Sequence, residues 1–148
     1  MKKYLILLIC MLVLVTGCSF KKEEVPSKDL AIDLVLTYEA RAAQSTEWDP
    51  KYEVNLFADH YMTSTYTNTE GFKTVELTDE QYQEIIDYIS SEKFTSLSSD
   101  LSDELLADGT YSSITIYYND NTTFKVGGYN VNNDVYNELV NMIREYAS

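Results

Sequence analysis

The residues that could carry out nucleophilic, redox or metal chemistry are few in this chain of 148 residues. His60 is the single histidine, and the two cysteines, Cys10 and Cys18, both lie near the amino terminus. Transition-metal sites draw mainly on histidine and cysteine, so the rest of the chain lacks a ligand set for one. No serine lies in a G-x-S-x-G motif, and neither common phosphate-binding glycine motif occurs. The sequence predicts no catalytic residue, no metal site and no cofactor.

Acidic residues are abundant, and two clusters of oxygen-bearing side chains could offer ligands to calcium. Asp100, Asp103, Glu104 and Asp108 form the first cluster, and residues 119–121, Asn-Asp-Asn, form the second. Neither cluster has the D-x-[DN]-x-[DN]-G spacing that wraps oxygens around one ion. We therefore expect solvated loops, with weak calcium binding as the alternative.

Cys18 follows a segment that has the features of an export signal in the correct order. Lys2 and Lys3 are basic, and residues 4–15 form an uncharged apolar run. A membrane-spanning helix needs about 20 apolar residues, whereas about 7–15 suffice for a signal peptide. We therefore expect residues 1–17 to be a signal peptide.

Val15-Thr16-Gly17-Cys18 resembles the lipobox of bacterial lipoproteins, in which an aliphatic residue and two small residues precede a cysteine. The resemblance implies lipid transfer to the Cys18 sulfur, cleavage between Gly17 and Cys18, and acylation of the new amine, for example with palmitate. Two or three acyl chains anchor a protein stably, at about 0.8 kcal/mol per buried CH₂. The expected location is the cell membrane, facing away from the cytoplasm. An ordinary secretory signal or a short uncleaved anchor is the alternative.

Residues 18–29 are predicted to be a lipidated flexible tether, and residues 30–148 a single globular domain. The tether is polar, lacks periodicity and could reach at most about 35 Å. The chain has 24 acids, 11 bases and a net charge of −13, and loss of the two signal lysines leaves −15. Phosphate binding needs clustered basic residues, so we expect no nucleic-acid partner, since Arg41 and Arg144 are the only arginines.

Period-2 alternation of apolar and polar residues predicts a series of strands. Residues 30–39 show it first, although a helix is also possible there. Asp59-His60 is a predicted turn between two strands, and residues 119–121 form another. The predicted strands are residues 30–39, 52–58, 61–67, 72–77, 113–118 and 122–126. Gly127-Gly128 is predicted to break the last strand, in a turn that requires positive φ.

Two amphipathic helices are predicted, over residues 79–89 and 133–143. Thr78 and Gln81 match a capping box before the first helix, and Asn132 or Asn133 caps the second. The apolar stripes have the spacing i, i+3, i+4, i+7 of a buried helix face. The stripes are Tyr82, Ile85, Ile86 and Ile89, and Tyr136, Leu139, Val140 and Ile143.

These elements predict an α+β fold, in which two hairpins and an N-terminal strand form an antiparallel sheet with both helices on one face. The two helices have similar sequences, and each follows a strand-turn-strand unit. A duplicated ββα unit explains this similarity, and so does the resemblance of any two amphipathic helices in an acidic chain rich in Tyr and Asn.

Tyrosines on predicted strands and loops suggest a binding surface on the sheet face that the helices leave uncovered. Tyrosine covers a large contact area with few rotatable bonds. The alternative is that these residues are half-buried and favoured by β propensity. The candidate residues are Tyr61, Tyr66, Tyr117, Tyr118 and Tyr129.

The mature domain also resembles small lipoproteins of Gram-positive bacteria. The positions that carry this resemblance are Leu77-Thr78, Ile85, Ile89, Phe94, Leu97, Asp108-Gly109, Ile114-Thr115-Ile116 and Gly127-Gly128-Tyr129-Asn130. More distantly, the domain resembles emfourin-type metalloprotease inhibitors in element order and in Gly71-Phe72. The predicted function is a non-enzymatic binding module with an envelope or extracellular protein partner. An extracellular protease inhibitor, or an envelope enzyme using acids and His60, is the alternative.

Overall fold

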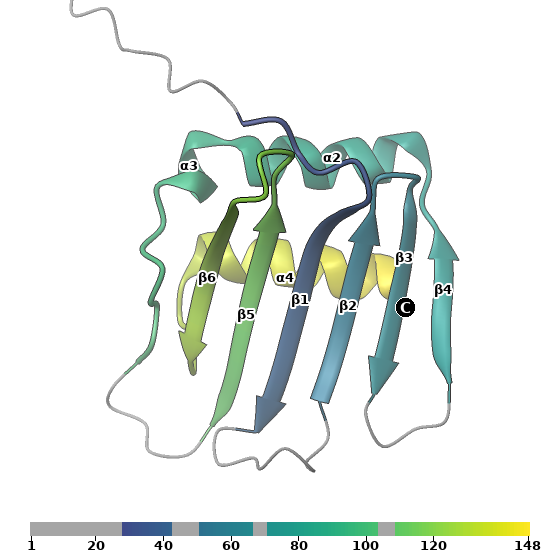
Figure 1. The fold of residues 1–148 in the computed structure, drawn as a ribbon. Helices are drawn as coiled ribbons and strands as arrows, with labels where there is room; N and C mark the ends of the chain where they lie inside the picture. The colour runs from purple at the N-terminus through teal and green to yellow at the C-terminus, as the bar shows by residue number, and fades with distance from the viewer. Residues whose placement is uncertain (1–27, 43–50, 67–70, 104–108) are drawn as a thin grey trace, which may run out of the picture.

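The computed structural model describes residues 28–42, 51–66, 71–103 and 109–148, which form one antiparallel sheet and three helices (Figure 1). The six strands have the order β4-β3-β2-β1-β5-β6. They are β1 (Leu34–Ala42), β2 (Lys51–Phe57), β3 (Tyr61–Tyr66), β4 (Phe72–Glu76), β5 (Thr110–Tyr117) and β6 (Thr123–Tyr129). The prediction of an α+β fold with an antiparallel sheet is confirmed. The signal peptide, the lipobox and the tether up to residue 27 lie outside the described residues.

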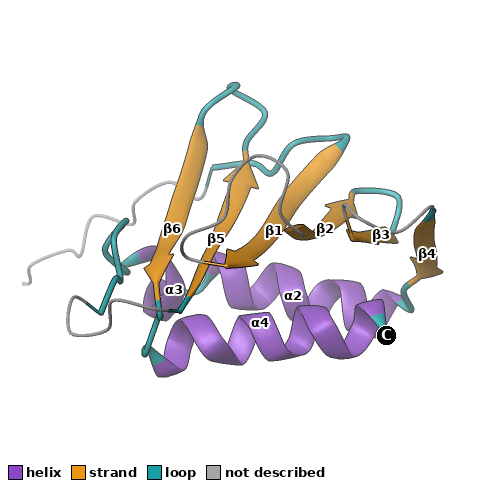
Figure 2. Ribbon diagram, turned by 90° about the horizontal axis from the view of Figure 1, so that it is seen from below, coloured by secondary structure: helices purple, strands orange, loops and turns teal. Residues whose placement is uncertain are grey.

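The chain builds the sheet outward from β1 in both directions. Strands β1 to β4 are successive neighbours. Helices α2 (Asp79–Ser90) and α3 (Glu92–Thr95) then lead the chain back across the sheet, where β5 pairs with the free side of β1. Helix α4 (Asp134–Ala147) crosses the strands again after β6. Figure 2 shows α2 and α4 on the same face of the sheet.

The hydrophobic core fills the space between this face and the helices. Leu36 pairs in register with Leu56 on one side and with Ile116 on the other, and none of the three is exposed to solvent. Ile85 of α2 and Leu139 of α4 are equally buried opposite them. Full burial of one such side chain contributes about 1.5–3 kcal/mol. The predicted apolar stripes therefore identify the helix faces that pack on the sheet.

The helices begin where the sequence predicts. The Thr78 hydroxyl accepts a hydrogen bond from Gln81 N at 3.2 Å, and Gln81 Oε1 accepts one from Thr78 N at 3.0 Å. This reciprocal pair is a capping box. Asn133, rather than Asn132, caps α4, because its side chain accepts from Tyr136 N at 3.1 Å.

The prediction that Gly127-Gly128 breaks the strand is wrong, because both glycines lie within β6. Their φ angles are +155° and +158°, which side chains rarely adopt. Crowding is a second reason for glycine at both positions. A Cβ at Gly127 would lie 2.2 Å from the Ser112 carbonyl oxygen, and a Cβ at Gly128 would lie 2.5 Å from Ser102 Oγ.

The two edges of the sheet differ. Residues 99–103 run alongside β6 and hydrogen-bond to its outer edge, with Leu101 N to Gly127 O and Asp103 N to Tyr129 O both at 2.9 Å. The opposite edge is the short strand β4, which pairs with β3 alone among the described strands. One edge of the sheet is thus covered by the chain itself, and the other is open in the described structure.

Candidate functional site

The sheet face opposite the helices carries the polar residues of the alternating strands, and no described helix covers it (Figure 2). Thr37 of β1 lies in register between Asn55 of β2 and Thr115 of β5, and Asn55 is followed by Thr63 of β3. Thr37 Oγ1 donates a hydrogen bond to Asn55 Oδ1 at 2.7 Å. We call the face that bears these residues the polar sheet face.

An ion-pair cluster beside this row stabilises the polar sheet face. Lys51 Nζ pairs with the carboxylates of Glu39 and Glu53, the latter at 2.9 Å, and Asn55 Nδ2 donates to Glu53 Oε1 at 2.9 Å. Hydrogen bonds from Lys51 and Asn55 lower the pKa of Glu53. Burial lowers the pKa of Lys51, but its hydrogen bonds to both glutamates outweigh burial, so that this pKa is raised. The charged and polar groups of Lys51, Glu53 and Asn55 are paired with one another, which indicates that the cluster has a structural role.

A cluster of one cation and two aromatic rings lies at one end of the polar sheet face. Arg41 is in register with Tyr111, which is in register with Tyr129. The Arg41 guanidinium lies 5.1 Å from the Tyr111 ring centroid, and the two rings meet edge to face at 5.2 Å. Arginine and tyrosine are enriched at the centres of protein interfaces. Arg41 and Tyr111 were not predicted as site residues from the sequence, although the pairing of their strands would have placed them beside Tyr129.

Three of the five predicted tyrosines lie on the polar sheet face. Tyr61, Tyr117 and Tyr129 belong to β3, β5 and β6, and each alternates with residues that point toward the helices. Tyr61 is 40% exposed and Tyr129 42%. Because they come from different strands, they are spread over the face instead of forming one pocket.

The other two predicted tyrosines lie elsewhere. Tyr66 faces the helix side, where its ring centroid is 4.7 Å from that of Tyr52. Tyr118 packs against the hydrophobic core, and Lys28 Nζ lies 5.4 Å from its ring centroid. The polar sheet face therefore does not include Tyr66 or Tyr118.

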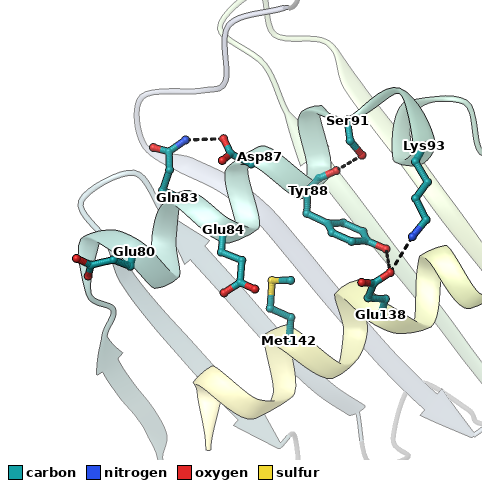
Figure 3. Close-up of a pocket in the computed structure, with 9 residues that line it drawn as sticks. All are labelled: Glu80, Gln83, Glu84, Asp87, Tyr88, Ser91, Lys93, Glu138 and Met142. Carbon is teal, nitrogen blue, oxygen red and sulfur yellow. Dashed lines mark hydrogen bonds and ion pairs between the residues drawn. The ribbon is translucent and has the colours of Figure 1, made fainter.

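A shallow groove of about 670 Å³ lies between α2 and α4 (Figure 3). Tyr88 Oη and Lys93 Nζ each donate to Glu138 Oε2 at 2.8 Å, and Gln83 Nε2 donates to Asp87 Oδ1 at 2.7 Å. The hydrogen bonds from Lys93 and Tyr88 lower the pKa of Glu138. The bonds of Tyr88 and Lys93 to Glu138 link α2 and α3 to α4, so these polar groups hold the helix layer together.

A second cleft, of about 460 Å³, lies between α4 and the strands β1 and β5, and we call it the α4 cleft. Arg144 Nη2 donates to Tyr38 Oη at 2.7 Å, and Tyr136 Oη donates to Ser112 Oγ at 3.0 Å. Burial raises the pKa of both tyrosines. Both hydroxyls therefore stay protonated at neutral pH and can act as hydrogen-bond donors.

His60, the residue considered for an enzymatic role, fastens a turn to the start of α2. Its backbone has a φ of +68°, and its imidazole stacks on Tyr82 with ring centroids 4.0 Å apart. His60 Nδ1 lies 3.2 Å from Asp79 Oδ1. These contacts give the histidine a structural role, because they join the turn between β2 and β3 to α2.

The acidic clusters considered for calcium use their carboxylates within local turns. Asp100 Oδ1 accepts from Ser102 N at 2.9 Å. Asp120 Oδ1 accepts from Thr122 N at 3.0 Å, and Lys28 Nζ lies 3.1 Å from Asp120 Oδ2. Hydrogen bonds from Thr122 and Lys28 hold the pKa of Asp120 at about 2. Residues 104–108, including Glu104 and Asp108, lie outside the described residues.

Within residues 28–42, 51–66, 71–103 and 109–148, no group of three or more His, Cys, Asp or Glu residues could hold a metal ion. In the same part of the chain, no helix combines the length and apolar character needed to cross a membrane.

Comparison with known proteins gives no match to this chain, either among protein-family models or among curated proteins.

Proposed function

We propose that this chain is a non-enzymatic binding domain, anchored by lipid outside the cytoplasm, which contacts another envelope or extracellular protein through the polar sheet face. The apolar run that ends in Val15-Thr16-Gly17-Cys18 supports the anchor. The observation that carries the binding role is the group of aromatic and cationic side chains, Arg41, Tyr111 and Tyr129, on a face that no described helix covers.

The position of the tether supports this choice of surface. Lys28, the first described residue, pairs with Asp120 in the turn between β5 and β6. Arg41, Tyr111 and Tyr129 lie at the other end of β1, β5 and β6. Strand β5 has eight residues, which span about 25 Å at about 3.4 Å each. The cluster therefore lies at the end of the sheet farther from the point where the tether joins the domain.

Substitution of the two cysteines tests the anchor. In a Gram-positive host given labelled palmitate, we expect the label and membrane association to be lost in Cys18→Ala and retained in Cys10→Ala. Unlabelled wild-type protein, or unchanged membrane association of Cys18→Ala, would contradict the lipid anchor.

A double substitution in the cluster of Arg41, Tyr111 and Tyr129 tests the binding surface. We expect an Arg41→Gln/Tyr129→Ser variant of the full chain to lose partner proteins that wild type captures by cross-linking on intact cells. Tyr66→Ser is the matched control, because Tyr66 is 54% exposed on the other side of the sheet. Equal loss in both variants would place the interaction elsewhere.

Titration of the full chain against secreted metalloproteases separates the binding proposal from the inhibitor alternative. We expect a panel of these proteases to keep its full activity. Stoichiometric inhibition would contradict the binding proposal and support the inhibitor alternative.

An internal ββα duplication is a further part of this proposal. Strands β2 and β3 with α2, and strands β5 and β6 with α4, each combine an antiparallel pair with one helix, on opposite sides of β1. Strand β4 has no counterpart in the second unit. Duplication would be supported by related chains whose two ββα units are more similar in sequence to each other than they are here. It would be opposed if the two units were dissimilar in every related chain.

A further inference from the structure

The α4 cleft combines an accessible guanidinium with buried hydroxyl groups. Arg144 is exposed, whereas Tyr38 and Tyr136, which also line the cleft, are each 1% exposed. The guanidinium lies 5.5 Å from the Tyr38 ring centroid and donates to the Tyr38 hydroxyl. These two contacts fix the direction of the Arg144 side chain while leaving other N–H groups free to bind a ligand.

The Tyr38 hydroxyl can also donate to a ligand. Its oxygen already accepts from Arg144, and the hydroxyl donates no hydrogen bond to another described residue. Burial is the main reason that the pKa of Tyr38 is raised, so the proton remains at neutral pH. A buried donor without an acceptor costs stability, which an acceptor oxygen from a ligand would recover.

Helix α4 places two amides beside the guanidinium. Asn137 and Asn141 are one helical turn apart, Arg144 follows three residues later, and all three side chains line the α4 cleft. Neither amide group is hydrogen-bonded to another described side chain. The two amides supply both donors and acceptors for polar groups next to an anion.

The charge of the cleft differs from that of the rest of the molecule. None of the described residues that line the cleft is an acid, and no described carboxylate lies within 4.0 Å of the Arg144 guanidinium. The groove between α2 and α4 has the opposite character, because Glu80, Glu84, Asp87 and Glu138 line it. Although the chain has a net charge of −13, no acid among the described residues pairs with the arginine of the α4 cleft.

We propose that the α4 cleft binds a small carboxylate, with Arg144 pairing with the carboxylate and Tyr38 donating to it. Asn137 and Asn141 bind polar groups next to the carboxylate. Guanidinium and carboxylate groups form short, charge-assisted hydrogen bonds, which gives the site specificity for an acid over its amide. The carboxyl end of a peptide and an acidic sugar share this chemistry, and the volume of about 460 Å³ admits a short fragment of either.

Calorimetric titration of the full chain in a non-ionic detergent tests the proposal. The probes are N-acetylglycine with N-acetylglycinamide for the peptide source, and glucuronate with glucuronamide for the sugar source. We expect at least one acid to bind about tenfold or more tightly than its amide, and the pair that shows this difference identifies the source. Equal binding of acid and amide in both pairs, or no saturable binding by either acid, overturns the proposal.

Variants of the two arginines assign the binding to this cleft. Arg144→Gln should weaken binding of the acid about tenfold or more, whereas Arg41→Gln, which removes the same charge from the polar sheet face, should leave it within about twofold. Tyr38→Phe keeps the ring and removes the hydroxyl, and should weaken binding severalfold. Unfolding curves establish that each variant is folded. Unchanged affinity in folded Arg144→Gln or folded Tyr38→Phe overturns the proposed contacts, and neither result bears on the polar sheet face.

Discussion

The lysines and arginines of this acidic chain are used differently. Lys28, Lys51 and Lys93 form ion pairs with aspartate or glutamate. Arg41 and Arg144 instead lie over the rings of Tyr111 and Tyr38. A ring fixes the position of a guanidinium without cancelling its charge. The two arginines therefore remain available to contact another molecule, and both proposed sites are centred on them.

The ion-pair cluster on the polar sheet face leads to a prediction about pH. Glu39 and Glu53 are direct cross-strand partners, so Lys51→Gln leaves two like charges opposite each other. We expect the free energy of unfolding to fall by about 1 kcal/mol at pH 7, measured by urea unfolding. Lys125→Gln on the same face controls for the lost positive charge.

At acidic pH, Lys51→Gln should change the free energy of unfolding little. The folded-state pKa of Glu53 is lowered, so its stabilisation is complete above the unfolded pKa, about 4.3, and is lost as the pH falls through the folded value. The difference between wild type and Lys51→Gln should therefore shrink below about pH 4. A difference that persists undiminished at pH 3 would show that Lys51 acts through packing.

Strand β6 depends on its glycines in a way that can be measured. Gly127→Ala adds a Cβ 2.2 Å from the Ser112 carbonyl oxygen at a φ of +155°. We expect a loss of about 3 kcal/mol in the free energy of unfolding, because both backbone strain and a backbone clash result.

Gly71→Ala is the matched control for this substitution. Gly71 has a φ of +115° with nothing within 4 Å of an added Cβ, so only strain is introduced and a loss of about 1 kcal/mol is expected. If the free energy of unfolding fell equally in the two variants, the clash with Ser112 would contribute nothing to the effect of Gly127→Ala.

The elements that local patterns specify were predictable from the sequence. The capping residues Thr78 and Asn133 and the apolar stripes of both helices act within a few residues, and the structure confirms them. The course of β6 was not predictable in this way. Gly127 is crowded by Ser112 and Ser113 of β5, and Gly128 by Ser102 of the segment beside β6, and these contacts are visible only in three dimensions.

For the candidate sites, residue type gave partial information. Tyrosine richness pointed to the sheet, yet strand order decides which tyrosines share a face, as Tyr66 and Tyr129 illustrate. The α4 cleft was missed because Tyr38 and Arg144 are 106 residues apart in the chain. Such a cleft has no local sequence pattern.

At the scale of the whole molecule, the sheet should exchange its amide hydrogens unevenly. Strand β1 has neighbours on both sides and buries Leu36 and Tyr38, whereas β4 pairs with β3 alone among the described strands and is mostly exposed. We expect the amides of β1 to exchange most slowly and those of β4 fastest, because local opening of an edge costs less. Mass-spectrometric hydrogen exchange measures this order, and equal protection of β1 and β4 would contradict it.

The unequal margins of the sheet also limit how copies of this domain could join to one another. Lateral recruitment of a further strand requires an unpaired backbone, which the described structure offers along β4, while residues 99–103 occupy the margin of β6. If two molecules paired through their β4 strands, the unpaired backbone of both β4 strands would be occupied. A continuous fibril of paired strands requires two unpaired strand edges per molecule, so assembly through β4 would stop at a dimer.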